Sequence, residues 1–263
     1  DFYPLEQSGN PDLDPEEGTS WFAGLVWNPE FLPGFELQLD FWDFAHEERI
    51  TPLPAQYVLR EKGNFGITRA PDEADGTPGR ITLVQETVVN ADELHTRGFD
   101  TTLGYSWQTD HAGAFRASLM HTYISEWSIS DISLLDTDFD ENLAGKYWWG
   151  GPLPRNRANL GLSWDRGPHG ASANIHYVDG FESYENEWVN GEMTDDYIQV
   201  SSYTTLDLQY SYRFAGLKNA VLRIGCNNVT DEDPNLATYS PFNEPLYDPR
   251  GRFYYVRWRQ PIR

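Results

Sequence analysis

Apolar and polar residues alternate with a period of two along most of the chain, and this period is typical of β-strands whose two faces meet different surroundings. In Thr204–Phe214, the clearest example, every second residue from Leu206 onward is apolar or aromatic. Eight other segments share the pattern: Thr19–Asn28, Phe35–Phe44, Gly98–Trp107, Ala114–Tyr123, Arg157–Trp164, Ala171–Val178, Ala220–Asn227 and Arg252–Gln260. No helical period competes with it, so the sequence predicts an all-β chain of nine strands.

The connections between these strands alternate between short and long. The short ones are rich in Gly, Pro, Asp or Asn: Asn28–Gly34, Gln108–Gly113, Asp165–Gly170 and Ala215–Asn219. The long ones are Ala45–Asp92, Ile124–Pro154, Asp179–Tyr203 and Asn228–Gly251. Connections in compact domains usually have about 4–6 residues. Because successive connections of a meander lie at opposite ends of its strands, all short turns should lie at one end and all long loops at the other.

This arrangement is typical of a transmembrane antiparallel up-and-down β-barrel, with short turns on one side of the membrane and long loops on the other. Aromatic residues near both ends of the strands fit interface girdles: Trp27, Trp107, Trp164 and Phe214 near the short turns, and Trp127, Trp148, Trp149 and Tyr184 near the long loops. A soluble β-sandwich also alternates, because one face of each sheet packs on a core. Its loops are not normally segregated by length, so the barrel is the preferred interpretation.

The formal net charge of −22 comes from the long connections, which hold most of the 41 acidic residues. Arginines within the strands instead fall on the polar side of the alternation: Arg116, Arg213, Arg223, Arg257 and Arg259. A strongly acidic chain repels phosphate groups, so we expect no binding to nucleic acid. No apolar stretch reaches the ~18 residues of a membrane-spanning helix. The single cysteine, Cys226, excludes an internal disulfide and a cysteine-based zinc site.

Candidate catalytic or metal-binding chemistry is sparse. The sequence contains no nucleophile elbow, phosphate-binding loop or zinc-binding helix motif, and its six histidines are scattered. Asp136, Asp138 and Asp140 have the spacing that begins a calcium loop, but Glu141 replaces the glycine and Tyr147 the bidentate glutamate. A solvated acidic loop is therefore preferred over loop-bound calcium, and we expect no enzymatic activity, metal or cofactor.

Aromatic and acidic residues in two of the long connections are the best candidates for ligand contacts. They are Tyr147, Trp148, Trp149, Tyr184, Glu187 and Trp188. Aromatic faces beside hydrogen-bond acceptors suit sugars or cationic groups. The competing interpretation is that these residues belong to the girdle and to ordinary loop packing.

Several segments resemble a known family in the order in which its motifs occur. Gly9–Glu16 resembles the N-P-x-L-x-P-E segment within the barrels of TonB-dependent receptors. Gly225–Asp231 looks like the N-N-L element near their penultimate strand, and Asp248–Tyr254 looks like the P-R entry to their last strand. Asn90–Phe99, before a strand, fits the same order. The chain departs from the family at Gln260–Arg263, where such barrels usually finish on an aromatic residue.

The resemblance implies a fold, a location and a set of partners. It implies that residues 1–263 form about nine C-terminal strands of a 22-strand barrel in the bacterial outer membrane. The activity implied is energy-coupled uptake of a bulky, scarce nutrient of the siderophore, cobalamin-like or oligosaccharide class. The partners implied are membrane lipid, a plug with further barrel strands, and a TonB-type energy-transducing protein acting through that plug.

Because nine strands cannot close a barrel of that size, we expect the chain to be a fragment or one chain of a split receptor, with the plug and TonB box supplied elsewhere. Two other functions stay open at this point. One is a passive porin-like or structural barrel, and the other is a soluble β-sandwich that binds a ligand or acts on glycans.

Overall fold

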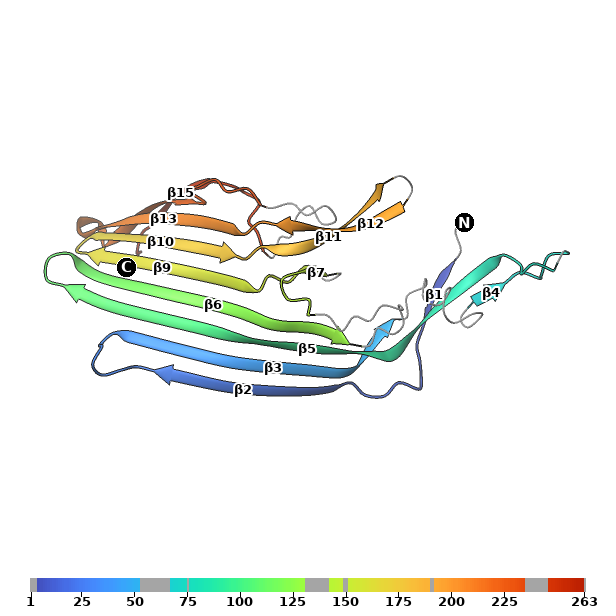
Figure 1. Ribbon diagram of the computed structural model, residues 1–263. Coiled ribbons are helices and arrows are strands. Elements are labelled where there is room, and N and C mark those ends of the chain that lie inside the picture. The colour runs from blue at the N-terminus through green and yellow to red at the C-terminus, as the bar shows by residue number, and fades with distance from the viewer. Residues whose placement is uncertain are drawn as a thin grey trace. The chain divides into compact units, whose positions relative to one another are not determined.

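Nine strands dominate the computed structural model, which describes residues 4–52, 67–74, 76–130, 142–148, 151–189, 192–234 and 246–262. They are β2 (Glu17–Trp27), β3 (Phe35–Pro52), β5 (Ile81–Thr109), β6 (Gly113–Ser130), β9 (Asn156–Arg166), β10 (His169–Val178), β13 (Tyr203–Phe214), β14 (Ala220–Asn227) and β15 (Phe253–Arg259). In the sheet they follow the order β15-β14-β13-β10-β9-β6-β5-β3-β2 (Figure 1). Each strand lies beside the one before it in this series, so the predicted up-and-down meander of nine strands is confirmed.

The remaining elements are short. Strands β1 (Leu5–Ser8) and β4 (Ile67–Arg69) both pair with β5. Two separate hairpins are formed by β7 (Tyr147–Trp148) with β8 (Gly151–Pro152) and by β11 (Phe181–Val189) with β12 (Glu192–Val200). One turn of 3-10 helix, Ala215–Leu217, connects β13 to β14. Within the described residues, no helix is long and apolar enough to cross a membrane.

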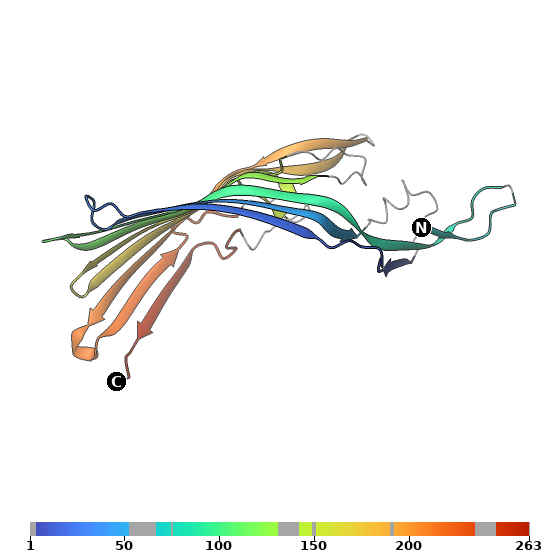
Figure 2. The same ribbon diagram turned by 90° about the horizontal axis from the view of Figure 1, so that it is seen from below.

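The chain divides into two compact units. Unit 1 comprises Asp1–Trp21, Asp43–Thr96 and Glu126–Asn142, and unit 2 comprises Phe22–Trp42, Arg97–Ser125 and Leu143–Arg263. Strands β2, β3, β5 and β6 therefore contribute one part to each unit. Figure 2 shows β15, in red, as the edge strand of unit 2, with the C-terminus following it.

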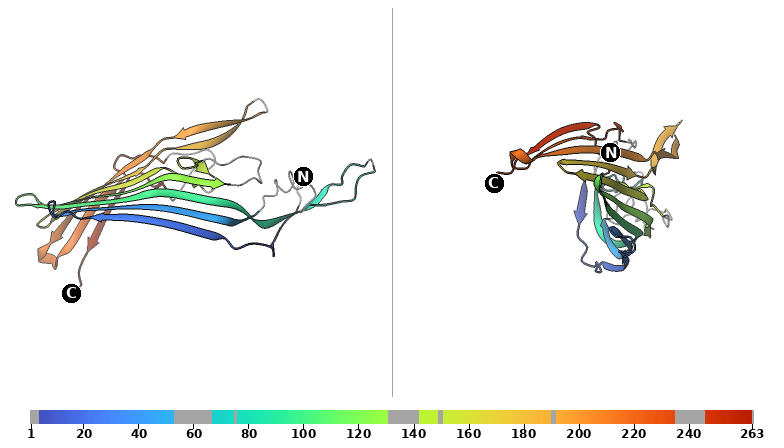
Figure 3. Two further views of the ribbon diagram at one scale, coloured as in Figure 1. Left: turned by 60° about the horizontal axis from the view of Figure 1, so that its bottom comes forward. Right: turned by 90° about the vertical axis from the view of Figure 1, so that its left-hand side faces the viewer.

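The strands of unit 2 have one apolar face and one polar face. On the apolar face, one lateral row runs across five strands through Leu162, Ala173, Leu208, Cys226 and Tyr254. The neighbouring row on the polar face runs through Ser163, Ser172, Gln209, Gly225 and Tyr255. Because directly paired residues share a face of the sheet, the register confirms the two-faced pattern. Both views in Figure 3 show how the sheet twists toward β13 and β15.

The strand arginines lie on the polar face, as predicted. Arg223 pairs directly with Arg257, while Arg213 and Arg259 lie on either side of Val221. Arg116 pairs with Ser163. In the part of the chain that the structure describes, none of these five guanidinium groups has a carboxylate within ion-pair distance. Like charges directly opposite each other on neighbouring strands are destabilising, so this basic patch is electrostatically uncompensated.

Aromatic rings line the short-turn end of unit 2. Trp107 stacks on Tyr105 and on Phe115, with ring centroids 5.2 Å apart in both pairs. The ring centroids of Phe214 and Trp258 are 5.7 Å apart. Nearer the start of the chain, those of Trp27 and Phe35 are 5.8 Å apart. Aromatic rings are therefore gathered at this end of the strands, as the sequence predicted, while their role as an interface girdle stays a prediction.

The strands extend into segments predicted as long loops. β3 continues to Pro52, β5 begins at Ile81 rather than near Gly98, and β6 continues to Ser130. Residues 181–200, predicted as part of a loop, form the β11–β12 hairpin. The prediction of loops was wrong in these segments because it relied on alternating polarity.

In unit 1, side chains hold the strands together. Asn90 donates from its amide to the carbonyls of Asp14 (2.9 Å) and Glu48 (2.7 Å) and accepts from the Asp14 N–H (2.9 Å). His95 of β5 bridges Asp43 of β3 at 2.8 Å and Glu126 of β6 at 3.0 Å. These contacts connect strands at positions where apolar alternation is absent.

Candidate functional site

A polar hollow of about 380 Å³ lies on the polar face of unit 2, at the long-loop end of the strands. The ends of β9, β10, β13 and β14 and the segment Leu246–Gly251 surround it. Its polar lining comes mainly from Arg157, Asn159, His176, Tyr203, Thr205, Asp207, Asn228 and Asp248. A concave site with convergent hydrogen-bonding groups is the usual setting for a small ligand.

A chain of contacts crosses this hollow from strand to strand. The register places Asn159, His176 and Thr205 opposite one another. His176 Nδ1 meets the Asn159 side-chain oxygen at 2.5 Å, and its Nε2 lies 3.3 Å from the Asp207 carboxylate. The other Asp207 oxygen accepts the backbone N–H of Asn228 at 2.8 Å. Each polar group is thus oriented by a partner on the neighbouring strand.

Asn228 closes the wall of the hollow by ordering the turn after β14. The residue has a positive φ of 49° and is 6% exposed. Its side chain donates to the Glu232 carbonyl at 2.8 Å and accepts the Glu232 N–H at 2.9 Å. Asparagine tolerates this left-handed conformation better than most residues. The Asn227–Asp231 motif therefore has a structural role, which Asp231 extends by accepting the Arg252 N–H at 2.9 Å.

A buried cluster packs beside the hollow and consists of Val178, Phe181, Val200, Tyr203 and Tyr247. The rings of Tyr203 and Tyr247 meet at 4.9 Å, and both residues are 4% exposed. Neither phenolic oxygen has a hydrogen-bond partner among the described residues. The pKa of Tyr247 is raised, mainly by burial of its hydroxyl and to a smaller extent by the electrostatic effect of Tyr203. An unsatisfied buried hydroxyl is costly, so these two oxygens are the least well satisfied polar groups of the buried cluster.

Asp248, also on the rim, is held by Arg250. The guanidinium donates to both carboxylate oxygens, with Nε 2.8 Å from Oδ1 and Nη2 2.5 Å from Oδ2. This hydrogen bonding holds the pKa of Asp248 below its ordinary value. The rim therefore keeps a charged acceptor whose orientation is fixed.

A second hollow of about 320 Å³ adjoins the first on the same unit. It is lined by Asp100, Thr101, Thr102, Met120, His121 and Thr122, and it shares Arg157 and Asn159 with the first. The Thr122 hydroxyl donates to Asp100 at 2.6 Å. A polar surface therefore continues from β5 to β14, wide enough for a ligand larger than either hollow alone.

Some of the residues predicted to contact a ligand lie near the polar hollow. Tyr147 is half-buried and packs against the buried cluster. Trp148 pairs through its backbone with Gly151, and β7 contacts β11, which contains Tyr184, Glu187 and Trp188. Trp149 lies outside the described residues. The structure thus brings the two predicted segments together, while their contact with a ligand stays a prediction.

The sequence patterns did not predict the polar hollow. Arg157, His176, Asp207 and Asn228 are far apart along the chain and converge only through strand register. The available signal was that each predicted strand carries a hydrogen-bonding residue on its polar side near the long-loop end.

Metal-binding groups are not assembled in the part of the chain that is described: no three or more His, Cys, Asp or Glu side chains could hold one ion. The acidic segment Asp136–Asp140 lies outside the described residues. The weak calcium alternative therefore stays a prediction.

A protein-family model described as "TonB dependent receptor-like, beta-barrel" matches residues 1–229. No curated protein matches the chain.

Solved structures give the same fold. The siderophore receptor PirA from Acinetobacter baumannii aligns with a TM-score of 0.61 and 17% identity, over 95% of this chain and 32% of that one. A variant of the ferric enterobactin receptor from Pseudomonas aeruginosa gives 0.59 and 16%, over 95% and 32%. A copper transporter, OprC, gives 0.53 and 17%, over 94% and 32%. The chain spans about a third of the length of these structures.

Proposed function

The chain belongs to the TonB-dependent receptor β-barrel family, and from this premise we propose that it forms part of the wall of an outer-membrane receptor that takes up a bulky, scarce nutrient by energy-coupled transport. The polar hollow on its inward-facing wall would contribute to the ligand site. The observation that carries this proposal is the convergence of hydrogen-bonding groups from four strands on one hollow, with two buried tyrosine hydroxyls left unsatisfied beside it.

Membership of this family indicates where the chain is located and what its strands contact. Its members are transporters of the bacterial outer membrane and not enzymes, which agrees with the location and the lack of enzymatic activity expected from the sequence. In such barrels the short turns face the periplasm, the long loops face outward, and an outward apolar band contacts lipid. The single meander also disagrees with a soluble β-sandwich.

The chemistry of the hollow favours a neutral or positively charged ligand with many hydroxyl groups. Asn159, His176 and Tyr203 supply hydrogen-bonding groups, two carboxylates (Asp207 and Asp248) supply acceptors, and Arg157 supplies one guanidinium. The acidic loops oppose the approach of an anion. Among the siderophore, cobalamin-like and oligosaccharide classes, this arrangement fits the oligosaccharide and cobalamin-like ligands better than an anionic ferric siderophore.

The aromatic residues of the outward segments would make the first contact. Tyr147 packs against the buried cluster beside the hollow, and the strand that contains Tyr147 and Trp148 contacts the strand that contains Tyr184, Glu187 and Trp188. Trp149 follows in the sequence and is included in the proposal. Stacking of sugar rings or cationic groups on their faces would hold the ligand before it reaches the wall.

The partners follow from the same premise. Relatives of this fold are about three times as long, and we assign the additional strands and the plug to another part of the receptor, in the same or a separate chain. A TonB-type protein acting through that plug would supply the energy.

The test uses the full-length receptor with three probes: a maltodextrin, cyanocobalamin and a ferric catecholate siderophore. Asp207→Asn and Tyr203→Phe should each weaken binding of the preferred probe, Asp207→Asn by about tenfold, equivalent to ~1.4 kcal/mol. Ser163→Ala, on the same face outside both hollows, is the matched control. Equal binding by Asp207→Asn and the control would contradict the proposed site.

Transport is tested separately from binding. Collapsing the proton-motive force should stop accumulation of the bound probe without releasing it from the receptor. Uptake that continues unchanged would identify a passive barrel instead. Alanine substitution of Trp148, Trp149 and Trp188 should weaken uptake while the barrel still assembles. Unchanged uptake would favour the competing interpretation that these residues belong to the aromatic girdle.

A further inference from the structure

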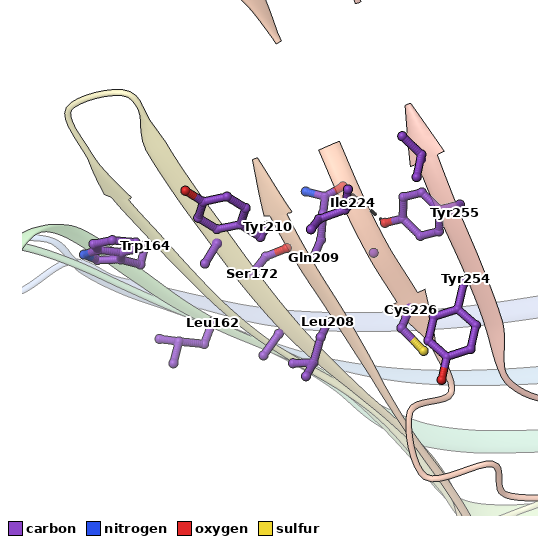
Figure 4. A pocket seen from close by; sticks show the side chains of 14 residues that line it. Leu162, Trp164, Ser172, Leu208, Gln209, Tyr210, Ile224, Cys226, Tyr254 and Tyr255 are labelled. Atoms are coloured by element: carbon purple, nitrogen blue, oxygen red, sulfur yellow. Dashed lines mark hydrogen bonds between the residues drawn. The ribbon is translucent and has the colours of Figure 1, made fainter. Parts of the chain in front are cut away.

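The apolar face of unit 2 contains a groove of about 720 Å³ that crosses β9, β10, β13, β14 and β15 (Figure 4). Its floor lies on β10, where Ala171 sits between Trp164 of β9 and Tyr210 of β13. In the next row, Ala173 is likewise flanked by leucines of the same two strands. Over β10 the groove is thus a depression between two ridges of large side chains, and beyond β13 it continues over β14 and β15. The volume of the whole groove is within the range of ligand pockets, about 300–1,000 Å³.

Both ridges are held in place by hydrogen bonds. The Trp164 indole N–H donates to the Ala112 carbonyl. On the other ridge, the Tyr210 hydroxyl is hydrogen-bonded to Nδ1 of His169, whose ring packs edge-on against Tyr212 at 5.1 Å. A groove with fixed walls binds an apolar chain at a lower entropic cost than a mobile surface does.

The short-turn end of the groove is basic. Arg166 lies two residues beyond Trp164 on the same face and is paired in register with His169. Among the described residues, Arg166 has no ion-pair or hydrogen-bond partner. The carboxylate of the nearby Asp165 lies on the opposite face of the sheet, over its paired residue Gly170. The cationic end is therefore not neutralised by the carboxylate of its own turn.

We propose that this groove binds one phospholipid of the periplasmic leaflet, with an acyl chain over Ala171 and Ala173 and the phosphate beside Arg166 and His169. The short turns of this family face the periplasm, which places the basic end at headgroup level. Basic side chains beside an apolar surface recognise anionic lipid headgroups. The complementarity of an apolar groove with one cationic end to an amphiphile with one anionic end favours this occupant over a second protein chain, which would need a larger contact area.

The test measures lipid retention by the full-length receptor, extracted in mild detergent and incubated with phosphatidylglycerol, using native mass spectrometry. The receptor should retain one phospholipid. Filling the groove with Ala171→Leu and Ala173→Leu should lower its affinity by at least about tenfold, equivalent to ~1.4 kcal/mol. Arg166→Glu should lower it by several-fold, because the headgroup loses its cationic partner.

Matched controls separate the groove from general lipid contact. Ala158→Leu makes the same change on the apolar row of β9 at the opposite end, and Arg213→Glu makes a charge reversal on the polar face. Both controls should retain the lipid. Equal retention by the filled-groove variant, equal loss in Ala158→Leu, or a bound lipopolysaccharide in place of phospholipid would each overturn the proposal.

Folding of every variant is checked by heat-modifiable migration in gel electrophoresis. If Arg166→Glu does not fold, Arg166→Gln takes its place and should still weaken retention. Ligand uptake is measured in parallel, so a failed lipid site is distinguishable from a failed transport function.

Discussion

The two units stabilise strands in different ways, although β3, β5 and β6 pass through both. In unit 2 the strands have an apolar and a polar face, and a buried cluster around Phe181 anchors the long-loop end. In unit 1 only Val84 and Ile129 are buried apolar residues among those described, and side-chain hydrogen bonds from Asn90 and His95 connect the strands. Alternating polarity thus distinguishes the strands of unit 2, whereas hydrogen-bonding side chains connect those of unit 1.

The largest expected effect comes from removing the anchor of unit 2. Phe181 is 3% exposed, so Phe181→Ala should cost about 3–5 kcal/mol of local stability by leaving a cavity. Hydrogen exchange in the full-length receptor should show β11 and the Tyr247 segment opening, while unit 1 keeps its protection. Equal loss of protection in both units would show that they are not separately stabilised.

A charge on the apolar face should be the next most severe change. Leu162→Arg places a guanidinium in the lipid-facing row and should cost about 2–4 kcal/mol if it lies near the membrane midplane. Ser163→Arg, one residue away on the polar face, is the control and should cost far less. Unfolding in urea from lipid vesicles measures both, and similar costs would contradict the assignment of the two faces.

The asparagines of the two units offer a comparison of hydrogen bonding. Asn228→Ala leaves buried groups of the turn unsatisfied and should cost about 1–3 kcal/mol. Asn90→Ala removes bonds between more exposed groups in unit 1, so about 0.5–1.5 kcal/mol is expected. Local hydrogen exchange at Glu232 and Glu48 provides the measurement, and a larger effect at Asn90 would reverse the comparison.

The smallest effect is a pH dependence confined to unit 1. Burial lowers the pKa of His95, but the hydrogen bonds that its ring donates to the carboxylates of Asp43 and Glu126 outweigh burial, so the pKa is raised above 6.5. The protonated bridge therefore contributes fully below that value, and its contribution is lost as the pH rises through the elevated pKa. Protection factors near His95 should fall across this range while those of β13 stay constant. His95→Gln should abolish the dependence.

The sequence predicted the strands correctly wherever apolar and polar residues alternate with a period of two. It predicted the nine strands, the aromatic residues near the short turns around Trp107 and the polar placement of Arg223 because lipid and water constrain alternate residues differently. It did not predict that β5 begins at Ile81, since apolar residues there occur on both faces, with Leu83 on one and Val84 on the other, and the period of two is not clean. The hollow around His176 and Asp207 depends on register between distant segments, which local patterning does not contain. Tyr147, predicted as a ligand contact, packs partly against the buried cluster, and its contact with a ligand stays a prediction.

The paired arginines of the polar face have a consequence for the direction of travel. In unit 2, Asp207 and Asp248 lie at the long-loop end, whereas Arg223 and Arg257 lie toward the short turns with no described carboxylate beside them. The carboxylates that line the hollow and the paired arginines thus lie toward opposite ends of the same face. A cationic group held beside Asp207 would be repelled by these arginines if it moved along the wall toward the short turns.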